Sequence, residues 1–381
     1  MNYSEITPYI RRMAEISTQN NGITSQMYLE NQVFRGLRDL NGKGVVTGLT
    51  EVSDVRAKRI NENGEAVPCP GELYYRGVNI SSLTDGFFGK RYGFEEAIYL
   101  LLFSKLPTRD ELAEFKWTLA SYRSLPPSFV RDMILKAPGK DMMNILSRSV
   151  LALYAYDDNP DDISVENVLR QCLQLISMFH MLAVYAYNSY QHYHRGKSLF
   201  IHLADPDLSI AESLLNLLRE DGKYTELEAK VLDMALVLHA EHGGGNNSTF
   251  TTHVVSSSGT DTYSAIAAAL GSLKGPKHGG ANIKVSAMFE DIKAHIKDWN
   301  DDNEVTAYID KIVNKEAFDK TGLVYGIGHA IYSISDPRAE VFKEYVKTLS
   351  AEKGLSNEFA LYSKVEEIAP KLIAKQRKMY K

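Results

Sequence analysis

The chain has 381 residues, of which 44% are hydrophobic and 24% are charged, as in a globular protein with a large core. Its net charge of −5 gives no electrostatic case for binding nucleic acid or an anionic membrane. Two cysteines, Cys69 and Cys172, exclude a disulfide framework. The N-terminal residues have neither the basic segment nor the apolar core of a signal peptide, so a cytoplasmic protein is expected.

The first predicted elements are β-strands. Residues 45–60 and 71–80 flank the turn-forming sequence Asn61-Glu62-Asn63-Gly64, a pattern that is typical of one or two β-hairpins. Helical periodicity dominates from there on. One apolar stripe at helical spacing predicts the next helix, and it consists of Phe94, Ala97, Ile98, Leu101 and Leu102.

Two capping boxes predict later helix starts. Pro107 follows the helix above, and Thr108-Arg109-Asp110-Glu111 opens the next one. Thr225-Glu226-Leu227-Glu228 opens a helix that runs into His239. A further helix, over residues 263–273, is rich in alanine and other small residues. We therefore expect it to approach another helix closely, within the subunit or across a dimer interface.

The most apolar run of the chain, residues 168–187, has almost the length of a membrane span. Four polar residues interrupt it, namely Arg170, Gln171, Gln174 and His180. A membrane span tolerates few such groups, so the run predicts a buried core helix and no association with a membrane.

The expected fold class is therefore all-α, with a small β-hairpin region near the start of the chain. No internal repeat, low-complexity tract or long linker interrupts the sequence. We expect a large helical domain over residues 1–275 and a small domain over residues 276–381. The glycine pair Gly279-Gly280, close to this boundary, is suited to a hinge.

Three of the ten histidines lie in glycine-rich loops at helix boundaries. Glycine lacks the Cβ that would keep a ligand away from the backbone, so the pattern predicts an active site drawn from three distant segments. The loops are Leu238-His239-Ala240-Glu241-His242-Gly243-Gly244-Gly245-Asn246, Gly275-Pro276-Lys277-His278-Gly279-Gly280-Ala281-Asn282, and Tyr325-Gly326-Ile327-Gly328-His329-Ala330, followed by Asp336-Pro337-Arg338.

Each of these residues also has a structural interpretation. His242 could cap its helix, and His278 and His329 could be ordinary loop residues. Arg338 could form a surface ion pair, although a guanidinium close to a histidine loop is suited to a bidentate grip on a carboxylate. No metal site is expected, because no His-x-x-x-His pair with a nearby carboxylate lies on one helix face. The histidines expected to be structural are His239, His253 and His295.

The three loops resemble those of citrate synthases, in the same order and with similar spacing. Tyr75-Arg76-Gly77-Val78-Asn79-Ile80 and the stretch from Phe94 to Thr108 resemble earlier motifs of that family, so the likeness covers most of the chain. The resemblance implies a mainly α-helical homodimer with an active site between a large and a small domain. It also implies condensation of acetyl-CoA with oxaloacetate to citrate and CoA through an enolate, the entry step of the tricarboxylic acid cycle.

The resemblance also assigns roles to residues. His278 would donate a hydrogen bond to the thioester oxygen, where negative charge develops, and His329 would polarise the ketone of oxaloacetate. No cofactor is bound permanently, and acetyl-CoA is a co-substrate. The binding residues that it implies are His242, Arg338 and Asn246 for oxaloacetate, and Gly326, Ile327 and Gly328 for CoA.

Two departures from the family pattern limit these expectations. The family base, an aspartate in an Asn-Val-Asp segment, has no match between Arg338 and Lys381. We therefore expect a truncated chain with impaired turnover; the alternative is a shortened relative that binds CoA and a dicarboxylate without catalysis. Ser333 also stands where many relatives have a basic residue for a CoA phosphate, with Lys277 and Lys284 as candidate substitutes.

The acyl substrate stays open at this stage. Citrate synthases and 2-methylcitrate synthases, which use propionyl-CoA, share these loops. A single methylene group changes binding only modestly, so the motifs do not separate the two activities.

Overall fold

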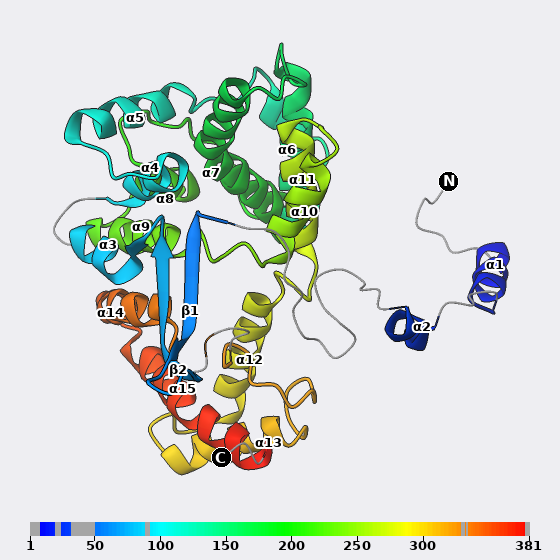
Figure 1. Cartoon of the computed structure of the whole chain (residues 1–381), viewed down its shortest axis with the longest axis vertical. Helices are drawn as coiled ribbons and strands as arrows, with labels where there is room; N and C mark the ends of the chain where they lie inside the picture. Colours follow the sequence, from blue (N-terminus) through cyan, green and yellow to red (C-terminus); the bar gives the residue numbers. More distant parts are fainter. Residues whose placement is uncertain are drawn as a thin grey trace. The chain divides into compact units, whose positions relative to one another are not determined.

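The structure is a computed structural model, and it describes residues 8–19, 24–31, 50–87, 92–328, 332 and 334–377. The chain divides into two compact units, Met1–Gly48 and Leu49–Lys381 (Figure 1). In the first unit the described elements are helices α1 (Pro8–Gln19) and α2 (Ser25–Glu30). Thr24 caps α2, because its hydroxyl oxygen accepts a hydrogen bond from the Met27 amide.

The second unit begins with a small antiparallel sheet in the order β1-β2-β3. Its strands are β1 (Ser53–Ile60), β2 (Ala66–Tyr75) and β3 (Val78–Asn79). Ser53 pairs with Tyr75 and Ile60 with Ala66, so the register closes on the predicted Asn61–Gly64 turn. The predicted hairpin is therefore confirmed, although its second strand begins at Ala66 and not at Gly71, and Ile80 already belongs to the helix that follows. Residues 45–49 lie outside the described residues.

The rest of the second unit is helical, which confirms the expected fold class. The shorter turns are η1 (Val130–Leu135) and η2 (Tyr154–Tyr156). The α-helices are α3 (Ile80–Phe87), α4 (Phe94–Phe103), α5 (Arg109–Ser121), α6 (Met142–Leu153), α7 (Val165–Arg195), α8 (Ile210–Leu218), α9 (Glu226–His239), α10 (Asn247–Ser256), α11 (Thr262–Lys274), α12 (Ala281–His295), α13 (Asp302–Val313), α14 (Pro337–Glu352) and α15 (Ser356–Arg377).

Both predicted capping boxes are present. The Glu111 amide donates to the Thr108 hydroxyl at 3.3 Å, and the Thr108 amide donates to the Glu111 carboxylate at 2.8 Å. Thr225 and Glu228 exchange the same two bonds at 3.1 and 2.8 Å. Each pair satisfies two amides that have no partner within the helix, which explains why α5 and α9 start where the sequence predicts.

The long helix α7 lies at the centre of the largest hydrophobic core, where it packs with α6, α11 and η1. By length and composition alone, this helix is also long and apolar enough to cross a membrane. Of its most apolar window, 56% is buried inside the protein, and the core helix of a globular protein meets the same criteria. The packing is that of the predicted core helix.

Two of the further cores of the second unit bear on its division into domains. One is formed by α12, α13 and α15, and the other joins β2, α3, α4 and α9 to the inner face of α14 (Figure 1). The first lies wholly after residue 275, whereas α14 packs on elements that precede it. The predicted division into residues 1–275 and 276–381 stays a prediction.

The carboxylate of Asp157, directly after η2, is the centre of a buried polar network. Its side chain is only 5% exposed, and both of its oxygens accept from Arg170 Nη2 at 2.8 Å. Tyr263 on α11 donates to it at 2.8 Å. Burial raises the pKa of Asp157, but the Asn159 amide and the Arg170 guanidinium outweigh burial and hold this pKa at about 2.

We expect Asp157→Asn to lower the free energy of unfolding at pH 7 by about 2–3 kcal/mol, because a charged hydrogen-bond acceptor is lost beside Arg170. The folded pKa lies below the ordinary value of 3.8, so this stability is present above pH 3.8 and is lost as the pH falls through about 2. Urea unfolding across this range should show the difference between wild type and variant shrinking towards acid pH. The exposed neighbour Asp158 supplies the control: Asp158→Asn should change stability by less than about 0.5 kcal/mol. Equal effects of the two changes would contradict the network.

Candidate active site

The loop that carries His242 is held by the first two strands. Tyr75 at the end of β2 donates to the Val237 and Glu241 carbonyls at 2.9 and 3.0 Å and accepts from the Glu241 amide. Ser53 at the start of β1 donates to the Glu241 carboxylate and accepts from the Gly243 amide, both at 2.9 Å. Because these bonds fix the residues on both sides of His242, its imidazole projects from a preorganised loop.

The nearest described partner of His242 is Tyr332. His242 Nε2 lies 3.3 Å from Tyr332 Oη, and the two rings meet edge to face at 5.4 Å. Tyr332 is 6% exposed. Burial, with the nearby Asp336 carboxylate, raises the pKa of Tyr332 to about 12, whereas Arg338 acts in the opposite direction. The phenol therefore stays protonated at neutral pH and remains a hydrogen-bonding partner for the imidazole.

The segment that carries Tyr332 crosses β2 at Gly71. The Gly71 amide donates to Ser335 Oγ at 3.3 Å. A Cβ atom at Gly71 would lie 2.3 Å from the Ser335 carbonyl oxygen and 2.6 Å from Tyr332 Cδ1. Only glycine permits this close approach, which brings the His242 loop and the start of α14 together over the strand.

Arg338 lies in the first turn of α14, where it forms an ion pair with the N-cap residue Asp336. Nε donates to one carboxylate oxygen at 3.0 Å and Nη2 to the other at 2.7 Å. The ion pair that the sequence allowed is therefore present, with both side chains about a quarter exposed. A guanidinium has five N–H donors, so this pairing leaves donors for a second carboxylate. The oxaloacetate-binding role of Arg338 stays a prediction.

Asn246 is the N-cap of α10. Its side-chain oxygen accepts from the Thr249 amide at 2.9 Å, and its amide group donates to the Gly243 carbonyl at 3.1 Å. These bonds close the His242 loop onto α10. The described contacts show a structural role, and substrate binding by Asn246 stays a prediction.

His278 follows α11 in a tight turn, and its Nε2 lies 2.9 Å from the hydroxyl of Ser248 on α10. Ser248 Oγ is also 3.2 Å from the Ala269 carbonyl of α11. Sequence reasoning missed Ser248. A signal was available, because a side chain in the first turn after a capped loop faces back along that loop. Ser248 connects the His242 and His278 loops through one short helix.

The close approach predicted for the small-residue helix is confirmed within the subunit. Two serines from different helices reach backbone carbonyls of α11: Ser147 on α6 lies 3.0 Å from the Ala267 oxygen, and Ser248 on α10 reaches Ala269. Only short side chains on α11 allow both neighbours this near.

The third loop is described only in part, because His329 and Ser333 lie outside the described residues. Gly326 and Gly328 have φ values of 85° and 92°, and the amide of Ile327 between them donates to the Val324 carbonyl at 3.2 Å. Ile327 packs against the core formed by α12, α13 and α15. The predicted roles of these residues towards CoA stay predictions.

Three of the groups that could supply missing functions already have partners. Lys284, a candidate for a CoA phosphate, forms an ion pair with Asp319 at 3.1 Å. The acids Glu241 and Asp336, which lie nearest in sequence to the histidine loops, are bound by Ser53 and Arg338. In the part of the chain that the structure describes, no group of three or more histidine, cysteine or acidic side chains could hold a metal ion.

The described site thus combines imidazole, phenol and guanidinium donors around one strand and one helix. Such donors suit an anionic substrate with a carbonyl group, on which negative charge develops during reaction. A mainly helical enzyme whose site is built from distant histidine loops is the class of protein that this arrangement defines.

Comparison with known proteins identifies the family. The family model described as "Citrate synthase, C-terminal domain" matches residues 38–381. A citrate synthase of Deinococcus radiodurans is 33% identical over 328 residues, which are 85% of this chain and 78% of that protein. The 2-methylcitrate synthase 1 of Corynebacterium glutamicum is 29% identical, over 89% of this chain and 80% of its own.

A solved structure agrees. The crystal structure of citrate synthase from Pyrobaculum aerophilum superposes with a TM-score of 0.70 at 26% identity, over 89% of this chain and 78% of that chain. The chain belongs to the citrate synthase family.

Proposed function

We propose that this protein condenses acetyl-CoA with oxaloacetate to give citrate and CoA. The observation that carries the proposal is the contact between His242 and Tyr332, which joins the first histidine loop to the segment that ends in Arg338. In this arrangement the donors of His242 and Arg338 serve the two carboxylates of oxaloacetate.

His278 acts on the acetyl thioester. When Ser248 donates its proton to His278 Nε2, the imidazole carries its own proton on Nδ1. Nδ1–H then donates to the thioester oxygen as a methyl proton leaves and the enolate forms. If the Ser248 hydroxyl instead donated its proton to the Ala269 carbonyl, His278 would carry its proton on Nε2. That contact is longer than the contact with His278, 3.2 Å against 2.9 Å, so the Nδ1–H form is the favoured one.

The new carbon–carbon bond forms between the enolate carbon and the ketone carbon of oxaloacetate. The ketone oxygen becomes an alkoxide, which takes its proton from His329. Water then cleaves the thioester of citryl-CoA and releases citrate and CoA. The group that accepts the methyl proton stays unassigned, because Glu241 and Asp336 are held by Ser53 and Arg338.

A second candidate is 2-methylcitrate formation from propionyl-CoA. Relatives of both names match this chain at similar identity, 33% for a citrate synthase and 29% for a 2-methylcitrate synthase. Competition between acetyl-CoA and propionyl-CoA, followed by mass spectrometry of the product, separates the two reactions. The homodimer, the closure of a small domain over the site, the cytoplasmic location and the place in the tricarboxylic acid cycle are also proposals, and they rest on the resemblance.

Binding and turnover test different parts of this proposal. Calorimetric titration of the 381-residue chain with oxaloacetate should show saturable binding, whereas thiol release after addition of acetyl-CoA should be slow, since Glu241 and Asp336 are held by Ser53 and Arg338. A rate near the enzyme median of about 10 per second would contradict impaired turnover. Absence of oxaloacetate binding would contradict the proposed function, and binding without any product would favour the non-catalytic relative.

A further inference from the structure

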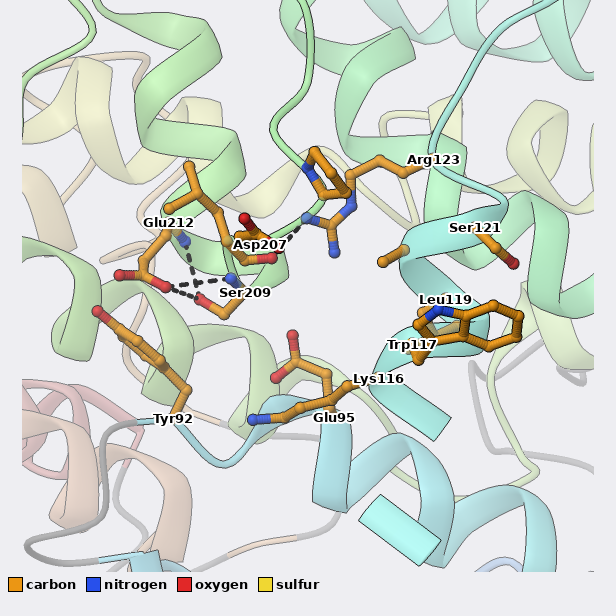
Figure 2. A pocket seen from close by; sticks show the side chains of 13 residues that line it. Tyr92, Glu95, Lys116, Trp117, Leu119, Ser121, Arg123, Asp207, Ser209 and Glu212 are labelled. Atoms are coloured by element: carbon orange, nitrogen blue, oxygen red, sulfur yellow. Dashed lines mark hydrogen bonds between the residues drawn. The ribbon is translucent and has the colours of Figure 1, made fainter. Parts of the chain in front are cut away.

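A hollow lies away from the histidine loops, between α4, α5 and the segment that leads into α8 (Figure 2). Its volume is about 630 Å³, which is within the range of small-molecule sites. Five side chains carry the argument: Glu95, Lys116, Trp117, Arg123 and Glu212.

Glu95 is a buried acid with one uncommitted oxygen. Glu95 is only 2% exposed. Its Oε1 accepts a hydrogen bond of 2.9 Å from the amide of Ile210, at the start of α8. Oε2 has no hydrogen-bond partner among the described residues. Figure 2 shows this carboxylate pointing into the hollow. A buried carboxylate oxygen without a donor is costly, so the site calls for a donor from outside the chain.

Arg123 faces the same hollow from the end of α5 (Figure 2). Its residue is 8% exposed, and Nη1 donates to the Asp205 and Leu208 carbonyls at 3.0 and 2.5 Å. These bonds fix the guanidinium, yet Nε has no acceptor in the described structure. Burial lowers the pKa of Arg123, while Glu95 acts in the opposite direction. The Glu95 carboxylate and the Arg123 guanidinium therefore interact electrostatically, but they form no direct ion pair.

The other charged groups of the hollow complete this pattern. Lys116 on α5 is half-buried and forms no ion pair with any described residue. Glu212 is already used as an acceptor, because its Oε2 takes hydrogen bonds from the Ser209 amide and hydroxyl at 3.1 and 3.0 Å. Asp207 lies at the exposed edge. Figure 2 shows the Lys116 side chain running alongside Glu95, whereas Arg123 lies on the opposite side of the hollow. The hollow thus presents a carboxylate on one side and a guanidinium on the other, each with one buried polar atom that has no partner among the described residues.

We propose that this hollow binds a small zwitterion, namely an α-amino acid. Its ammonium group donates to Glu95 Oε2, and its carboxylate accepts from the Arg123 guanidinium. A free anion would leave Glu95 without a donor, and a free cation would leave Arg123 without an acceptor. Trp117, which is 72% exposed beside the hollow, offers an apolar surface to the side chain of the ligand. The site is separate from the residues proposed for condensation.

The test uses Trp117 as reporter. The only other tryptophan, Trp299, packs against the core of α12, α13 and α15, so a Trp299→Phe chain reports on Trp117 alone. Titration with each proteinogenic L-amino acid that does not itself fluoresce at the tryptophan wavelength should reveal at least one saturable change. The corresponding acid without the amino group, and the amine without the carboxylate, should bind about tenfold or more weakly.

Two variants localise the binding. Glu95→Gln keeps the acceptor for the Ile210 amide but replaces the open oxygen by a donor, and Arg123→Gln removes the guanidinium. Each should weaken binding about tenfold or more, whereas Glu114→Gln, on the exposed face of α5, should leave it unchanged. Thermal unfolding checks that each variant folds. Absence of any saturable change, or equal affinity in Glu95→Gln and Glu114→Gln, would overturn the proposal and leave water as the occupant. Oxaloacetate binding is measured separately, so failure here does not bear on the proposed function.

Discussion

Replacing Gly279 by alanine is expected to lower the free energy of unfolding by about 3 kcal/mol and to displace His278. A Cβ atom at this position would lie 2.1 Å from the Leu273 carbonyl oxygen, which belongs to the last turn of α11. That oxygen is a backbone atom, so it cannot turn away as a flexible side chain would. The turn must therefore open, and the 2.9 Å contact between His278 and Ser248 opens with it.

Gly271, on α11 itself, provides the matched control. A Cβ atom there meets nothing within 4 Å. Gly271→Ala should therefore raise the stability by about 0.5–1 kcal/mol, because alanine favours a helix and restricts the unfolded chain. Urea unfolding measures both changes, and NMR of the His278 ring nitrogens reports whether the Ser248 contact survives. If Gly279→Ala were as stable as Gly271→Ala, the close approach in this turn would be wrong.

Local signals predicted the helices well. The apolar stripe from Phe94 predicted α4, and the boxes at Thr108 and Thr225 predicted the starts of α5 and α9, because capping is decided by neighbours in sequence. Composition predicted the close packing of α11 for a similar reason, since small side chains set how near another helix can come.

Contacts between distant segments could not be predicted in this way. Nothing in the sequence around Gly71 indicates that Tyr332 and Ser335 contact the strand there, since that close approach depends on the position of residues about 260 positions away. The partner of His242 was missed for the same reason. For Arg338 the sequence left two carboxylate partners open, a surface acid and a substrate. The described partner is Asp336 of the same turn, and the motif alone could not decide between the two.

The ion pair of Arg338 leads to the second large effect. Arg338→Gln is expected to weaken oxaloacetate binding about 100-fold, because an ionic hydrogen-bonded contact to a buried carboxylate is worth about 2–5 kcal/mol. Arg338→Lys should lose a large part of the same affinity, since an ammonium keeps the charge but cannot form two parallel bonds. Calorimetric titration with oxaloacetate measures both variants, and this prediction rests on the proposed function.

A matched control distinguishes substrate binding from loss of a surface ion pair. Arg56 also forms an ion pair with an aspartate two residues before it, Asp54, at 2.6 Å. In that pair both side chains are more than half exposed. Such a pair contributes about 0–1 kcal/mol to stability, so Arg56→Gln should leave both folding and oxaloacetate affinity unchanged. Equal oxaloacetate affinity in Arg338→Gln and Arg56→Gln would show that Arg338 serves only to pair with Asp336 at the start of α14. A selective loss in Arg338→Gln, with thermal stability near that of the unmodified chain, would instead place a substrate carboxylate on the guanidinium donors that Asp336 leaves open.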